Sequence, residues 1–314
     1  MTTLQPPRAP RHGPAHAAPT GSGLGYMAQS ALWFAVMSLL VKLASATMPT
    51  MQIVFGRGCV TLVLSLLVLW RARLRPFGTR PGLLLLRGLI GSCALVCFYA
   101  AVVHLPLAEA TVIHQTAPLF TAVLAALLLD ERLDARVLVA IALCLAGVLM
   151  IARPDWLFGG PAVAPAAPFP WVYAFVALLG SLLSAFAYVT VRRLGRTENP
   201  LVVVFYFPLV TVPLTAPFAI PQWIWPDATG WLLLLGIGVS TQIAQVALTN
   251  GLAREPAGRA TTVGYLQVAF AAVFGALVFG SWPDAWSLAG MALILGSLLG
   301  STRPWRRSTT LPLQ

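Results

Sequence analysis

The sequence predicts an all-α, polytopic membrane protein with ten transmembrane helices in two inverted five-helix repeats. Three observations support this prediction: the composition, a series of ten apolar segments, and a self-similarity of the chain at a spacing of 150 residues. Of the 314 residues, 58% are hydrophobic and only 9% are charged, whereas about 25% of the residues in a soluble domain are charged. Because so few charges cannot cover a water-exposed surface, we expect lipid to surround most of the chain.

Apolar segments and short polar loops alternate along the chain after residue 23. Residues 1–23 are rich in Pro, Ala and Gly, and we interpret them as a disordered tail rather than a signal peptide. A helix needs ~20 apolar residues to cross a bilayer, and it satisfies its own backbone hydrogen bonds there. We expect spans at 24–46, 50–70, 81–103, 106–129, 135–152, 171–191, 201–220, 229–249, 259–280 and 286–302.

The spans divide into two repeats. Residues 24–152 contain the first five and residues 171–302 the second five, with a Pro-rich external loop at 153–170 between them and a basic tail at 303–314. Shifted by 150 residues, the chain matches itself at 24 of the 76 positions from 79 to 154. Because each repeat has an odd number of helices, the second enters the membrane upside down. Inverted repeats of this kind are typical of secondary transporters, whose binding site lies near the midplane between the halves.

The basic residues predict the orientation in the membrane. They are 19 arginines and Lys42. If the N-terminus is cytoplasmic, that side contains 16 of these 20 residues, the outer loops contain only Arg153, and Lys42, Arg57 and Arg87 lie within spans. Cytoplasmic loops are enriched in Lys and Arg, so we expect both termini to be cytoplasmic. The same arginines account for the net charge of +11 without a nucleic-acid partner.

Other functional classes have less support in the sequence. The four cysteines lie inside apolar segments and indicate no disulfide framework, and we expect no cofactor or metal. No phosphate-binding loop is present, because "GSGLG" at 21–25 does not follow a strand. An intramembrane enzyme for lipid or isoprenoid substrates needs clustered acids or a nucleophile–base pair. That enzyme and a non-transporting scaffold remain the alternatives to a transporter.

The chain resembles the EamA-type transporters of the drug/metabolite transporter superfamily over about residues 24–302. The matching residues are Arg57, Arg87-Gly88, "FYA" at 98–100, "LPLAEA" at 105–110, "APLF" at 117–120, Glu131, Gln245, Thr249, Ala260-Thr261 and Gly290. This chain departs from the family at Ser281, where the second repeat commonly has Glu. The resemblance implies a transporter of a small metabolite, often an amino acid, across the bacterial inner membrane. It also implies export by alternating access around a midplane cavity.

Two ionisable residues inside spans are the first candidates for a substrate site, because a charge in the bilayer is costly. Arg57 lies about seven residues, or ~10 Å, from the outer end of its helix. Its guanidinium requires an anion, which is either the carboxylate of Glu109 or that of a substrate. Glu109 is the only acid within a span, and it can also stabilise the N-terminal end of its own helix.

The remaining ionisable residues each have two interpretations. Lys42 and Arg87 lie near span ends and can extend to the interface, although Arg87 is equally compatible with burial. His114 is either a hydrogen-bonded core residue or a cavity residue that, like Glu109, can carry a coupling proton.

The polar and aromatic candidates complete the predicted substrate site. In the second half, Gln245 belongs to a polar stripe on one helix face. In the ninth span Tyr265 and Gln267 point in nearly opposite directions, so we expect at most one of them to contact the substrate. Tyr99, Trp33 and Tyr188 are candidate aromatic walls. The sequence does not decide between a monomer and a homodimer.

Overall fold

The computed structural model describes residues 22–105, 107–152, 171–280 and 282–301. Every regular element in these ranges is helical. Most of the helices follow the predicted spans to within a few residues at each end, because long apolar stretches fix a helix better than they fix its ends. The helices are α1 (Gly23–Ala44), α2 (Thr50–Arg71), α3 (Pro81–His104), α4 (Leu107–His114), α5 (Ala117–Leu129), α6 (Ala135–Ala152), α8 (Trp171–Leu194), α9 (Pro200–Ala219), a 3-10 turn η1 (Ile220–Gln222), α10 (Ala228–Arg254), α11 (Ala257–Val263), α12 (Leu266–Phe279) and α13 (Ala285–Ser301).

Nine helical segments in the described ranges are long and apolar enough to cross a membrane, and Ala285–Leu299 of α13 is a shorter apolar helix. The predicted fourth and ninth spans are not continuous helices. Each consists of two helices, α4 with α5 and α11 with α12, that are separated by a short break. The predicted external loop at 153–170 and both predicted tails lie outside the described residues, apart from the last two residues of the N-terminal one.

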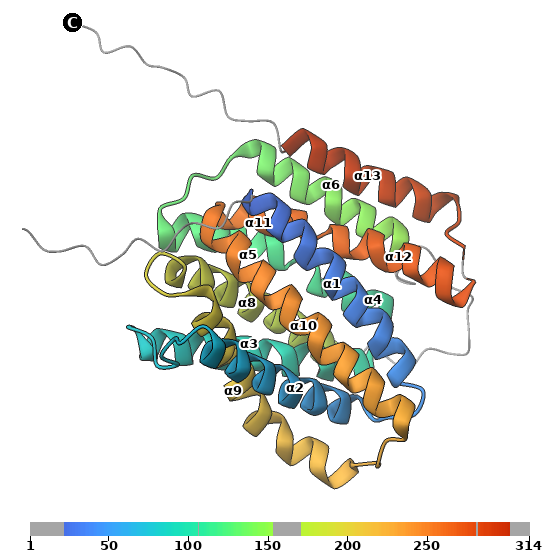
Figure 1. The fold of residues 1–314 in the computed structure, drawn as a ribbon. Coiled ribbons are helices and arrows are strands. Elements are labelled where there is room, and N and C mark those ends of the chain that lie inside the picture. Colours follow the sequence, from blue (N-terminus) through green and yellow to red (C-terminus); the bar gives the residue numbers. More distant parts are fainter. Residues whose placement is uncertain (1–21, 106, 153–170, 281, 302–314) are drawn as a thin grey trace, which may run out of the picture.

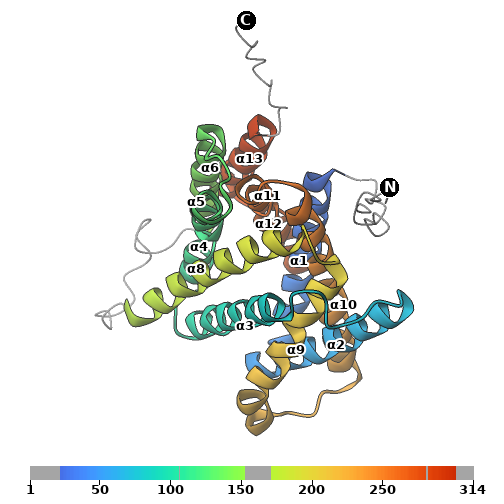
Figure 2. The same ribbon diagram turned by 90° about the vertical axis from the view of Figure 1, so that its left-hand side faces the viewer.

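The packing of the helices has the pseudo-two-fold pattern of an inverted repeat. Helix α1 of the first half packs on α10 of the second, and the equivalent pair, α8 and α3, packs in the same way. Likewise α5 contacts α8 where α12 contacts α1, and the self-equivalent pairs α2·α9 and α6·α13 lie side by side. Figures 1 and 2 show α6 and α13 together at one edge of the molecule and α2 with α9 towards the opposite edge.

Two polar clamps link the segments that flank α9 to the first half of the chain. Gln52 donates from Nε2 to the Ile224 carbonyl (2.6 Å) and accepts from the Ile224 N–H (2.9 Å). At the other end, Glu198 accepts from the backbone N–H groups of Thr79 (2.8 Å) and Arg80 (2.7 Å) at the start of α3. Buried polar groups cost free energy unless they are hydrogen-bonded, so these clamps hold the two halves together while remaining satisfied.

Helices α6 and α13 approach each other at glycines. A Cβ on Gly147 would lie 2.6 Å from the Gly290 carbonyl oxygen, and a Cβ on Gly290 would lie 2.6 Å from the Gly147 carbonyl oxygen. Small residues allow close helix packing in membranes. This pair of helices is therefore built as a compact unit beside the rest of the molecule.

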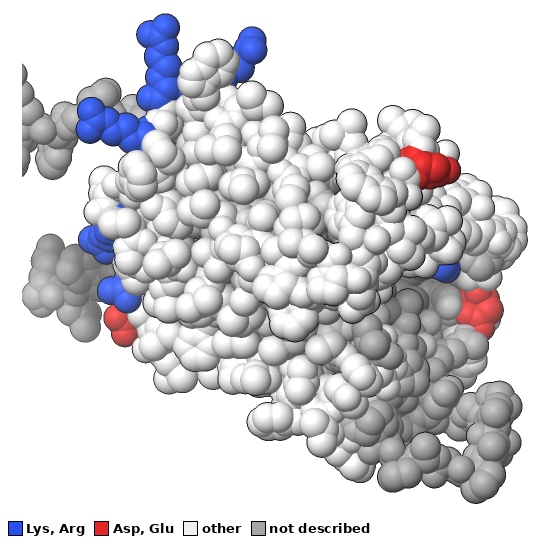
Figure 3. Space-filling view, turned by 90° about the horizontal axis from the view of Figure 1, so that it is seen from below, with Lys and Arg blue, Asp and Glu red and all other residues white. Residues whose placement is uncertain are grey.

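The outer surface is apolar over most of its area. Large side chains such as Leu127, Trp225 and Leu299 are more than 70% exposed. Figure 3 shows a broad uncharged belt, with most Lys and Arg side chains on that face gathered at one end of the molecule. This distribution matches a protein whose belt is covered by lipid and whose charged ends meet water.

Candidate functional site

A cavity of about 250 Å³ lies in the centre of the molecule, between the two halves. Its walls come from α1, α2 and α3 of the first half, from α8, α9 and α10 of the second, and from the breaks in the two discontinuous helices. Inverted-repeat transporters place their substrate site at such a position, where broken helices supply free backbone groups and helix ends.

The two helix breaks meet at residues that are equivalent in the repeat. Gln115 follows α4 and Tyr265 follows Gly264 after α11, and their numbers differ by 150. The Tyr265 hydroxyl donates a 2.7 Å hydrogen bond to the Gln115 carbonyl. That bond satisfies a carbonyl that the break removes from the helical pattern. It also fixes the breaks of the two halves against each other at the cavity wall, where both residues lie.

Arg57 lies in α2 and lines the cavity with only 5% of its surface exposed. Its Nη1 is 3.5 Å from the Met37 sulfur. No acidic side chain that the structure describes forms an ion pair with it. Glu109 belongs to α4, and its side chain, with the predicted Arg57–Glu109 pair, lies outside the described part of the structure.

Arg87 lies in α3, is 3% exposed, and also lines the cavity. The interpretation that it extends to the interface is wrong, because its guanidinium lies over the Phe207 ring (4.8 Å) and its Nη2 is 3.5 Å from the Gln245 Oε1. Its Nε and Nη1 are buried without a hydrogen-bond partner in the described structure. Gly91, one turn along α3, leaves room for it, since a Cβ there would lie 2.5 Å from Arg87 Nη1.

Arg87 is the main site residue that the sequence analysis did not assign to the substrate site. Its distance from the helix end was compatible with either burial or extension to water. The signal that could have identified it was the same as for Arg57, namely a charge several residues inside an apolar span.

His114, at the end of α4, lines the same cavity. Its ring lies against Phe98, with 4.5 Å between ring centroids, and its Nδ1 is buried without a hydrogen-bond partner among the described groups. A buried, unpaired ring nitrogen is available for a polar atom in the cavity.

Of the other predicted site residues, five line the cavity and Trp33 does not. These five are Tyr99, Tyr188, Gln245, Tyr265 and Gln267. Tyr265 and Gln267 both line it at the junction of α11 and α12, where the N–H groups of Gln267 and Val268 donate to carbonyls three residues earlier, those of Gly264 and Tyr265. Trp33 is half-buried and lies outside the lining residues, where its neighbour in α1, Phe34, takes the wall position instead.

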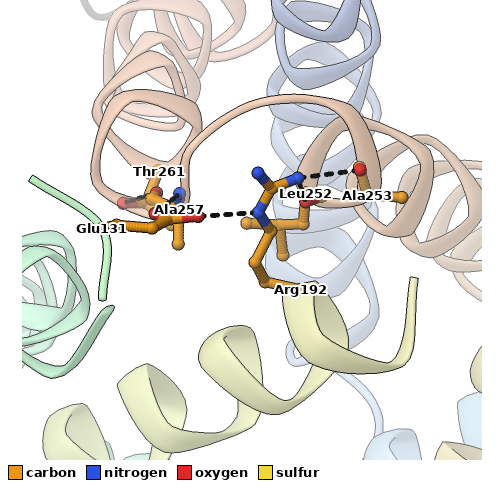
Figure 4. Close-up of polar contacts among 6 residues, drawn as sticks. All are labelled: Glu131, Arg192, Leu252, Ala253, Ala257 and Thr261. Carbon is orange, nitrogen blue, oxygen red and sulfur yellow. Dashed lines mark hydrogen bonds and ion pairs between the residues drawn. The ribbon is translucent and has the colours of Figure 1, made fainter. Parts of the chain in front are cut away.

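One end of the molecule is held by an ion pair between Glu131, which follows α5, and Arg192 of α8 (Figure 4). The Arg192 Nε donates to Glu131 Oε1 at 2.8 Å, and its Nη1 donates to the carbonyls of Leu252 (3.1 Å) and Ala253 (2.8 Å) near the end of α10. Glu131 Oε2 accepts from the Ala257 N–H (2.8 Å) at the start of α11. The first half is thereby tied to three helices of the second, and we call this cluster the Glu131 latch.

The equivalent position at the opposite end is built differently. Lys42, the repeat counterpart of Arg192, places its Nζ 4.2 Å from the centroid of the Phe279 ring in α12. Lys42 is exposed near the end of α1, as expected for a residue that extends to the interface. A cation–π contact at an exposed site contributes only ~0.5–1 kcal/mol. The contact at this end is therefore weaker than the Glu131 latch at the other end.

Comparison with known proteins agrees with this architecture. The model of the EamA-like transporter family matches residues 21–153 and 171–303, one copy for each half. The pseudopaline exporter CntI of Pseudomonas aeruginosa strain UCBPP-PA14 is 33% identical over 287 residues, covering 90% of this chain and 96% of that protein. Solute carrier family 35 member G1 of Mus musculus is 28% identical over 293 residues, covering 91% of this chain and 79% of that protein.

A solved crystal structure has the same fold, with a TM-score of 0.78 and 19% sequence identity over 90% of this chain and 99% of that chain. Two family matches on two halves, around a shared central cavity, explain why the helix breaks and the packing repeat at an interval of 150 residues. The chain therefore belongs to the EamA-like transporter family.

Proposed function

We propose that this transporter exports a small carboxylate-containing metabolite, such as an amino acid or a related compound, by alternating access around the central cavity. The observation that carries the proposal is the buried guanidinium of Arg57 on the cavity wall, without an acidic partner among the described side chains. A guanidinium binds a carboxylate through two parallel hydrogen bonds, and a low-dielectric site strengthens them. Tyr99, Gln245, Tyr265 and Gln267 supply further polar contacts, and His114 supplies a buried ring nitrogen.

Alternating access is supported by the division of the molecule into parts. The first four spans of each repeat surround the cavity and rock about it, while α6 and α13 form the packed unit described above. The Glu131 latch closes one end, and it must open before the cavity can reach water on that side. Because basic residues concentrate in the loops at the latch end, we assign that end to the cytoplasm of a bacterial cell and both termini to the same side.

Export is the favoured direction because one of the similar proteins is described as a pseudopaline exporter. The family match supports transport over the two alternatives, an intramembrane enzyme and a scaffold. His114 and Glu109 are the groups that we assign to a coupling proton, His114 because its Nδ1 is buried in the cavity wall.

The test is transport by purified protein in liposomes. Labelled amino acids and related carboxylates should accumulate with the wild-type protein, and Arg57→Ala should abolish their flux while the variant is still expressed and inserted. Lys42→Ala, which removes a basic side chain outside the cavity, is the matched control and should leave flux within about twofold, since exposed contacts contribute little. Normal flux in Arg57→Ala would refute the assigned role.

A further inference from the structure

Two arginines, not one, present their side chains to the central cavity. Arg57 of α2 is 5% exposed and Arg87 of α3 is 3% exposed. A buried charge without a counter-charge is far more costly than a buried polar group. A transporter that retains two such charges in its cavity therefore requires compensating negative charge there during its cycle.

The described neighbours of both guanidinium groups are neutral. Arg57 contacts the Met37 sulfur, and Arg87 contacts the Gln245 amide and the Phe207 ring. Two nitrogens of Arg87 have no hydrogen-bond partner in the described structure. These contacts hold Arg87 in place and leave most of its donors unused.

The described acids are located elsewhere. Every described acidic side chain lies at a helix end or in a loop, away from the cavity lining: Asp130, Glu131, Asp134, Glu198, Asp227, Glu255 and Asp284. Glu109, whose side chain is not described, is the one further acid within a span. A single carboxylate neutralises one arginine, so the charge count still leaves at least one cation for a ligand.

The two arginines reach the cavity from opposite sides of the membrane, although each lies near the first residue of its own helix. Arg57 lies seven residues after the first residue of α2, and Arg87 lies six residues after the first residue of α3. These offsets correspond to about 10 Å and about 9 Å along the helix axes. Because α2 and α3 are successive spans joined by a short loop, they run in opposite directions, and the two guanidinium groups belong to different levels of the cavity.

We infer that the substrate is a small dianion with two separated acidic groups, one bound by Arg57 and the other by Arg87. This inference rests on the proposed function and specifies its substrate class. Gln245 and Phe207 act as positioning residues, because they hold the Arg87 guanidinium in the cavity wall. Bound in this way, the substrate neutralises both buried cations at once. A single substrate carboxylate compensates only one of them, and the described part of the cavity lining offers no acid for the other.

The experiment compares matched ligands that differ by one charge. Purified protein is heated with succinate, glutarate, adipate or pimelate and with the half-amide of each acid, and liposomes are loaded with the same compounds for transport. A ligand that binds only the folded state raises its stability. At least one dicarboxylate should protect the wild-type protein and be transported, with its half-amide weaker by about tenfold or more, since the half-amide loses the charge-assisted hydrogen bonds of one carboxylate.

Variants assign each charge to a residue. Arg57→Gln and Arg87→Gln should each weaken the dicarboxylate until it binds no better than its half-amide, and the Lys variants should retain part of the preference because they keep the charge. If a Gln variant does not fold, the comparison of acid and half-amide on the wild-type protein still decides the question. Glu109→Gln should preserve the preference of the wild-type protein for the dicarboxylate.

The outcomes separate this inference from the proposed function. Equal binding of acids and half-amides, or protection by none of the dicarboxylates, would overturn the dianion. Transport of a monocarboxylic amino acid under those conditions would leave the proposed function standing. A loss of the preference in Glu109→Gln would also overturn the inference, because it would show that Glu109 helps to define the anion site.

Discussion

The Glu131 latch gives the sharpest prediction, because its contacts are all defined. Replacing Glu131 with Gln retains the size of the side chain but removes the negative charge that lies 2.8 Å from Arg192. It also places an amide group where two donors point, the Arg192 Nε–H and the Ala257 N–H. Both charged side chains are only 14% exposed, so solvent screens the pair weakly. A hydrogen bond to a charged group contributes ~1.5–3 kcal/mol.

We take about 2 kcal/mol as the loss, since Arg192 keeps its bonds to the Leu252 and Ala253 carbonyls. In the proposed alternating-access cycle the latch forms only while this end is closed, so its loss shifts the equilibrium towards the state open at this end. At 1.4 kcal/mol per tenfold change, the shift is about 30-fold as long as the open state is the minor one.

The assay uses a cavity thiol and a membrane-impermeant maleimide. Ser184 of α8 lines the cavity and is 8% exposed, so Ser184→Cys reports the access of water to it. The background must first lose the native cysteines. These are Cys59, Cys93, Cys97 and Cys144. In vesicles of both orientations, labelling from the latch side should accelerate by up to about 30-fold in Glu131→Gln, and labelling from the other side should not accelerate.

The control is Glu255→Gln. Glu255 forms a partly exposed i,i+4 pair with Arg259 at 3.5 Å near the same end, and such pairs contribute only ~0.3–0.5 kcal/mol. Its labelling rate should therefore change by less than about threefold. The reasoning is refuted if Glu131→Gln labels at the wild-type rate, or if labelling rises equally from both sides, which would indicate general loosening.

Two further predictions use the glycines. Gly91→Ala should push the Arg87 guanidinium out of place and lower transport by about tenfold. A Cβ at Gly82, on the same helix, meets nothing within 4 Å, so Gly82→Ala should leave transport unchanged. Measuring flux in liposomes distinguishes the two variants. Gly147→Ala should destabilise the protein by ~1–3 kcal/mol, because its Cβ meets backbone that cannot yield. Gly296→Ala meets open space and should not lower the melting temperature in detergent; equal melting temperatures for these two variants would contradict the packing described for α6 and α13.

The sequence alone predicted the architecture, and the physical reason is the bilayer. Lipid requires each span to be a continuous apolar stretch with internal hydrogen bonds, so spans could be located without knowledge of their neighbours. The 150-residue similarity and the odd number of helices then predicted the inverted repeat. Arg57 was predicted as a candidate for the same reason, since a charge far from either span end cannot be explained by the interface.

The tertiary structure decided the features that depend on contacts between distant residues. The breaks at Gln115 and Tyr265 lie inside apolar stretches that resemble continuous helices, and they become visible only when the two halves meet there. The burial of Arg87 depends on Phe207 and Gln245, which come from the other repeat. Similarly, Glu131 was only a charged helix end in the sequence, and its partners, Arg192 of α8 and the Ala257 N–H at the start of α11, follow it by 61 and 126 residues.

Local composition therefore determined which segments cross the membrane, because the hydrophobic requirement acts on each segment separately. The residues that line the cavity, the burial of Arg87 and the latch were decided only by packing, because the free energy of a charge in lipid depends on which neighbours come within hydrogen-bond distance.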